Sequence, residues 1–101
     1  MTEASDIRAL LRRTGELTPT QRLVVMLYAL SATDRGGVVR ETGRDLASQL
    51  NMTPTVFSRM RKQLVFLGWL EESEKFAHIA YFRLSPRALG EQVVVPMRRA
   101  I

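Results

Sequence analysis

The sequence predicts a mainly α-helical fold with one small β-hairpin, in a single domain that spans residues 1–101. The first observation behind this prediction is that apolar residues recur at helical spacing in four segments, each opened by a serine or threonine that can cap a helix. The second is that apolar residues alternate with other side chains over residues 80–84, as in a strand with one buried face. Four helices, a hairpin and a last helix are therefore the expected order of elements.

Composition and length predict one folded domain with a polyanionic partner. A chain of 101 residues is long enough for one small core, and 46% hydrophobic with 25% charged residues is an ordinary globular balance. The net charge of +5 favours nucleic acid or an anionic membrane surface. The longest apolar run, residues 23–30, is far shorter than the roughly 20 residues that cross a bilayer. We expect no membrane partner and, because the N-terminus lacks a signal-peptide pattern, a cytoplasmic protein.

The residue types present do not predict a catalytic, metal or cofactor site. The chain has no cysteine and one histidine, His78, which has no neighbouring histidine or carboxylate at metal-ligand spacing. Glu71, Glu72 and Glu74 are more simply a charged hairpin surface than a pair of catalytic carboxylates. We therefore expect no enzyme activity, no cofactor and no bound metal.

The N-terminal part of the chain predicts two helices and a short strand. Ser5 can cap a helix that runs to about Arg13. Thr18 and Pro19 open a second helix, which is apolar on nearly all sides and therefore belongs at the centre of a small helical bundle. Residues 38–39 are a short candidate strand after the loop that follows this helix.

Residues 42–68 predict two short helices that meet at a tight corner. Thr42 caps the first helix, and Asn51 ends it because asparagine tolerates a left-handed backbone. Thr53 caps the second helix, which ends at Gly68. A helix, a short turn and a second helix form the unit that places its second helix in the major groove of DNA.

The second of these helices, residues 53–67, separates polar from apolar side chains. Its apolar residues fall on one face, and between Thr53 and Gly68 there are three basic residues and no acid. Arginine and lysine pair with phosphates or guanine edges, and hydroxyl groups bond phosphates or bases. The candidate DNA-binding residues of this helix are Thr53, Pro54, Thr55, Ser58, Arg59, Arg61 and Lys62.

Alternatives stay open for this polar face. The same side chains also fit a solvated helix face on a purely structural domain. Arg61 lies near the edge of the apolar face, so its side chain can instead run along that face. Thr53 serves the helix first as its cap.

Apolar residues at the end of the same helix form a second candidate surface. Residues 65–67 are consecutive and apolar, and they cover too wide an arc for one buried face. They contact either the protein's own terminal helices or a partner. The candidate protein-binding residues here are Val65, Phe66 and Trp69.

After these helices, residues 69–84 predict a β-hairpin with its turn at about residues 73–77. This turn lacks glycine, asparagine and aspartate, so the sequence assigns it no turn type. His78 is expected at the start of the second strand. A last helix is expected over residues 86–95, with a proline at its first position.

The pattern over residues 17–92 resembles a known family. The matching positions are Leu46 and Ala47, Met52 and Thr53, Phe57, Ser58 and Arg59, Leu64 and Gly68, and Leu84 and Ser85. In this order and spacing they resemble the winged helix-turn-helix core of the MarR-type bacterial transcriptional regulators, in which the β-hairpin is the wing.

The resemblance implies a homodimer that binds double-stranded DNA and regulates transcription. The second helix of the pair then occupies the major groove, and the hairpin reaches the DNA backbone or the minor groove. In this chain the hairpin is shorter than in the family, and Lys75 and His78 are its candidate contacts. Two alternatives stay open: a winged-helix module that binds a protein through the apolar surface, and a plasmid replication or partition factor that binds DNA.

Overall fold

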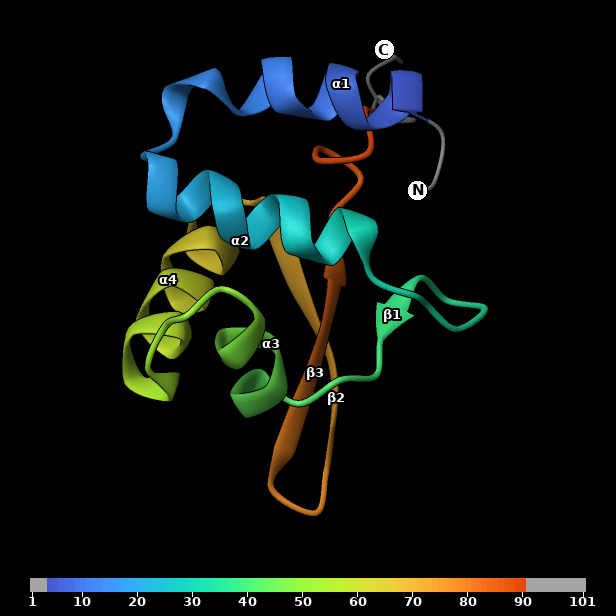
Figure 1. The fold of residues 1–101 in the computed structure, drawn as a ribbon. Coiled ribbons are helices and arrows are strands. Elements are labelled where there is room, and N and C mark those ends of the chain that lie inside the picture. Colours follow the sequence, from blue (N-terminus) through green and yellow to red (C-terminus); the bar gives the residue numbers. More distant parts are fainter. Residues whose placement is uncertain (1–3, 91–101) are drawn as a thin grey trace, which may run out of the picture.

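The computed structural model describes residues 4–90 of the chain, drawn as a ribbon in Figure 1. Its elements, in chain order, are α1 (Ala4–Arg13), the 3-10 helix η1 (Thr14–Glu16), α2 (Pro19–Leu30), β1 (Val38–Val39), α3 (Gly43–Gln49), α4 (Pro54–Phe66), β2 (Leu70–Phe76) and β3 (Ile79–Leu84). The strands form an antiparallel sheet in the order β1-β3-β2. The predicted fold class, mainly α-helical with a small β-hairpin, is confirmed.

Threonine side chains begin three of the helices, as the sequence predicts. Each hydroxyl oxygen accepts a hydrogen bond from the backbone N–H three residues on: Thr18 from Gln21 (3.2 Å), Thr42 from Asp45 (3.1 Å) and Thr53 from Val56 (3.2 Å). These bonds satisfy N–H groups that have no partner within the helix. Asn51 has a φ of 57° at the corner between α3 and α4, and Gly68 has a φ of 87° after α4. Local chemistry thus fixes where the two helices begin and end.

Helix α2 lies at the centre of the domain, as predicted. Four of its residues are buried and join one hydrophobic cluster with residues of α1, α3, α4 and the sheet. The ring of Tyr28 stacks against that of Phe57 in α4, with ring centres 6.4 Å apart. Burial raises the pKa of the Tyr28 hydroxyl, and a hydrogen bond with Arg61 acts in the opposite direction. This packing holds α4 in a fixed orientation.

The hairpin has a longer first strand and a shorter turn than the sequence predicts. Pairing shifts between Glu72 and Glu74, which lets β2 continue through residues expected in the turn. The turn consists of Ala77 and His78, with φ angles of 51° and 71°. Two consecutive positive φ angles are the pattern of a type I′ hairpin turn. The predicted turn at residues 73–77 and the placement of His78 in a strand are therefore wrong.

The chain after the hairpin returns to the N-terminal helix. The guanidinium of Arg13 in α1 donates a hydrogen bond to the Ala88 carbonyl. Residues 86–90 form turns, in which the Ala88 N–H donates to the hydroxyl of Ser85 (3.2 Å). Of the helix predicted over residues 86–95, this first part forms turns, and the remainder lies outside the described residues.

Candidate nucleic-acid interface

The outward face of α4 results from the burial of its opposite face. Phe57 and Leu64 are 1% and 0% exposed in the core, and the helix packs against α2 and α3. Because one face of α4 is buried, its opposite face forms a large strip that is exposed to solvent. Five of the predicted DNA-binding residues lie on this strip and are exposed: Pro54, Thr55, Ser58, Arg59 and Lys62.

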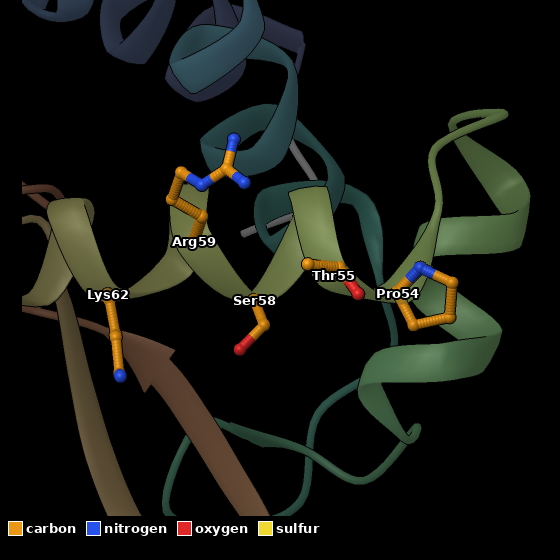
Figure 2. A pocket seen from close by; sticks show the side chains of 5 residues that line it. All are labelled: Pro54, Thr55, Ser58, Arg59 and Lys62. Carbon is orange, nitrogen blue, oxygen red and sulfur yellow. The ribbon is translucent and has the colours of Figure 1, made fainter.

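These five side chains line one open hollow along α4 (Figure 2). Ser58 and Lys62 point to the side on which the hairpin lies, whereas Arg59 points to the opposite side. Within residues 4–90, Arg59 and Lys62 form no ion pair with a carboxylate, since the ion pairs there involve other arginines. Both flanks of the exposed strip thus carry a cation that an anionic ligand can neutralise.

Two further hollows join this strip to the hairpin, and Ser58 borders both of them. One lies where α3 and α4 begin, and it is lined by Arg44 on one side and by Ile79 near the hairpin tip on the other. The second lies between α4 and the hairpin, where Lys62, Lys75 and the acidic residue Glu72 line it. The outward face of α4 and the hairpin therefore form one continuous concave surface.

Arg44 belongs to this surface, although sequence reasoning did not select it. It is exposed in the first turn of α3, directly after the Thr42 cap and Gly43. A cation in the first turn of a helix is opposed by the helix dipole, so a helix gains nothing from an arginine there. That unfavourable position is the signal in the sequence that singles out Arg44 as a functional candidate.

Comparison with solved structures identifies the fold. The adhesin competence repressor AdcR from Streptococcus pyogenes matches with a TM-score of 0.54 and 24% sequence identity, over 83% of this chain and 58% of that chain. ZitR from Lactococcus lactis, solved as a double mutant in apo form, matches with a TM-score of 0.54 and 18% identity, over 89% of this chain and 67% of that chain. This chain has a winged-helix fold. No protein-family model matches the chain, and no curated protein matches it in sequence.

In this winged-helix domain the hairpin β2–β3 is the wing, and Arg61 packs between the wing and α4. Its guanidinium carbon lies 5.5 Å from the ring centre of Phe57 and 4.1 Å from that of Phe82 in β3. A Cβ atom on Gly43 would come within 3.0 Å of the same guanidinium. These contacts match the interpretation in which Arg61 runs along the apolar face. Arg61 therefore orients the wing, and its predicted DNA contact stays a prediction.

The remaining candidate residues lie at different points of the winged-helix surface. Thr53 begins α4, and its hydroxyl accepts the capping hydrogen bond. Lys75 is exposed on β2 and borders the hollow between α4 and the wing. His78 is exposed in the turn at the wing tip. The fold thus brings Lys75 close to Lys62, while His78 lies at the far end of the wing.

The second predicted surface is smaller than expected, because Trp69 is not part of it. Trp69 is 2% exposed and belongs to the core, and the guanidinium carbon of Arg87 lies 4.5 Å from the centre of its ring system. The prediction that Trp69 binds a protein partner is therefore wrong. Phe66 is 90% exposed at the end of α4, and Val65 and Leu67 are about two fifths exposed.

Other kinds of site find no support in the part of the chain that the structure describes. Residues 4–90 contain no group of three histidine, cysteine, aspartate or glutamate side chains placed to hold a metal ion. No helix among these residues is both long and apolar enough to cross a membrane. The surface that combines charge, shape and exposure is the one formed by α4 and the wing.

Proposed function

We propose that this winged-helix protein binds specific sequences of double-stranded DNA as a MarR-type bacterial transcriptional regulator, without enzyme activity of its own. The observation that carries the proposal is the exposed strip of α4, where Arg59 and Lys62 have no carboxylate partner within the described residues and Thr55 and Ser58 add hydroxyl groups. An α-helix fits the major groove, which is about 12 Å wide. The word repressor in the name of AdcR supports the same conclusion. A cytoplasmic location, beside the bacterial chromosome, belongs to this proposal.

The residues of this surface divide into two roles. Arg59 and Ser58 contact base edges in the major groove, because arginine forms paired hydrogen bonds with guanine and serine bonds most bases. Lys62 and Lys75, on the two sides of the hollow between α4 and the wing, contact the phosphates of the strand that passes between them. Arg44 contacts the phosphates beyond the start of α4.

We further propose that the protein acts as a homodimer. Two copies related by a two-fold axis place their α4 helices in successive major grooves, about 34 Å apart, on a palindromic site. A dimer bound at a promoter blocks or recruits the polymerase by occupying that site.

The test is fluorescence anisotropy with labelled duplexes chosen by selection from a random pool. We expect Arg59→Ala to lose about 1 to 3 kcal/mol of specific binding, the amount typical of one paired contact with a base. Arg12→Ala is the matched control, because Arg12 is an exposed arginine of α1. If the wild type binds no selected sequence more tightly than the roughly 10⁻⁴ to 10⁻⁶ M of non-specific binding, specific recognition is wrong.

A second function is supported by one observation, the 90% exposure of Phe66. In this alternative the protein is an interaction module, and Phe66 with Val65 binds another protein while the basic strip is solvated. Light scattering and a pull-down distinguish the two functions. A monomer that captures a protein partner, loses it on Phe66→Ala and ignores DNA would establish the second function and exclude the first.

A further inference from the structure

The wing ends in an exposed apolar pair instead of the polar tip that a solvated hairpin needs. Phe76 is 70% exposed, and Ile79 is 36% exposed. The two residues are direct cross-strand partners at the last step before the turn. Directly opposed residues project from the same face of a hairpin, so their side chains form one small apolar edge at the tip. Exposure of a large aromatic ring at a projecting tip is informative, because solvation alone favours a polar residue there.

The backbone at this tip keeps the pair projecting. Ala77 and His78 form a two-residue turn with positive φ angles, although neither is a glycine or an asparagine. Such a turn is the narrowest way to close a hairpin. In Figure 1 the wing extends past α3, away from α1 and α2. The tip is therefore thin and projects beyond the helices.

Charge and position indicate the partner of this tip. At the tip, residues 75–80 contain Lys75 and His78 and no acidic residue, whereas the glutamates of the wing, Glu71, Glu72 and Glu74, lie further from the turn on β2. Ile79 borders the hollow that also contains Arg44 and Ser58, so the tip continues the surface that we propose to contact DNA. With α4 in a major groove, a wing beside it reaches the neighbouring minor groove, which is about 6 Å wide.

We infer that Phe76, supported by Ile79, inserts as an apolar wedge between two base pairs of the minor groove next to the site bound by α4. This inference rests on the proposed DNA-binding function. Apolar side chains that enter the minor groove unstack one base step and kink the duplex toward the major groove. Pyrimidine–purine steps such as TA unstack most easily. The wedge thus selects a flexible step at a fixed distance from the bases that α4 contacts, without a hydrogen bond to those bases.

The experiment compares Phe76→Ala with the wild type on a selected duplex that carries 2-aminopurine at the flexible step. The wild type is expected to raise the 2-aminopurine fluorescence, because the probe brightens when it is unstacked. Phe76→Ala is expected to abolish this rise and to weaken binding by about 5- to 100-fold, as loss of one contact between a base and an aromatic side chain does. The salt dependence of binding is expected to stay unchanged, because no phosphate contact is lost.

Two further variants make the result specific. Phe76→Leu is expected to restore most of the fluorescence rise, since leucine also acts as a wedge. Leu30→Ala is the control, because it also removes a large exposed apolar side chain. Leu30 is 65% exposed at the end of α2, away from the wing tip (Figure 1). It is expected to bind and to unstack the probe as the wild type does.

The outcomes separate this inference from the function on which it rests. If the wild type binds no selected duplex, both are wrong. If the wild type binds but Phe76→Ala has the same affinity and the same fluorescence, the wedge is wrong and the proposed function stands. If Phe76→Ala keeps its DNA affinity and instead turns a dimer into a monomer in light scattering, the tip is a contact between subunits, which also overturns the wedge.

Discussion

Helix α4 and the wing tip face the same surface, but the fold determines them to different degrees. The helix has a threonine cap, a proline at its first position and two buried anchors, Phe57 and Leu64. The cap and the buried residues determine which side of α4 faces the core, and the exposed strip is the opposite side. The tip has a turn of two non-glycine residues at positive φ and an apolar pair that nothing in the core requires. Residues whose presence does not stabilise the fold are better evidence of binding than residues that the fold demands.

The largest expected effect comes from removing an anchor of α4. Leu64→Ala is expected to lower the free energy of unfolding by about 2 to 5 kcal/mol, because the 0% exposed side chain leaves a cavity in the core. Urea denaturation followed by circular dichroism measures the change. Lys62→Ala, on the exposed strip two residues away, is expected to stay within about 0.5 kcal/mol of the wild type. Equal losses in the two variants would contradict the division of α4 into an anchored and a free face.

A smaller effect is expected where the two regions meet. Arg61→Ala removes a guanidinium that lies over Phe57 of α4 and Phe82 of the wing. We expect a loss of about 1 to 2 kcal/mol in urea denaturation, from two cation–π contacts and the packing of the side-chain stem. Arg59→Ala is the matched control, with an expected change in unfolding free energy of at most about 0.5 kcal/mol. An Arg61→Ala protein as stable as the wild type would show that Arg61 does not hold the wing against α4.

The wing tip is expected to become more stable when its turn is relaxed. Ala77→Gly removes the steric conflict of a Cβ atom at a φ of 51°, and we expect a gain of about 0.5 to 1 kcal/mol in thermal or urea unfolding. Ala9→Gly in the middle of α1 should change stability in the opposite direction, by about 1 kcal/mol. A loss of stability in Ala77→Gly would mean that the φ angle of the turn differs from the one described.

The smallest expected effect concerns pH and the loop before β1. Hydrogen bonding lowers the pKa of Asp34 below its usual value of 3.8, chiefly through the Val38 N–H (3.0 Å) and also through Arg40 and the Gly36 N–H. A lowered pKa means that this carboxylate stabilises the fold above pH 3.8 and that the contribution is lost as the pH falls through the lower, folded value. Asp34→Asn should therefore show a weaker dependence of stability on pH below 4 in acid titrations. An unchanged acid profile would contradict this assignment.

The sequence predicted the parts of the fold that depend on local chemistry. The caps at Thr18, Thr42 and Thr53 and the positive φ at Asn51 follow from residue type and spacing alone. The wing turn did not follow, because Ala77 and His78 carry no turn signal and the pairing of the two strands decides the register.

In the candidate site, too, local features were predicted from the sequence and contacts between distant segments were not. Helical spacing was enough to predict which side chains of α4 are exposed. It did not reveal that Arg61 packs on Phe82, since that ring comes from a strand about twenty residues further along the chain. The burial of Trp69 was not predicted, because it depends on how the chain continues into the core after the positive φ angle of Gly68.

Arg87 links the end of α4 to the base of the wing. Its guanidinium donates hydrogen bonds to the Leu67 carbonyl at the end of α4 (2.7 Å) and to Glu16 before α2 (2.8 Å), and it covers Trp69 at the base of the wing. One side chain thus contacts both the C-terminal end of α4 and the base of the wing, and it ties the orientation of the wing to that of the helix.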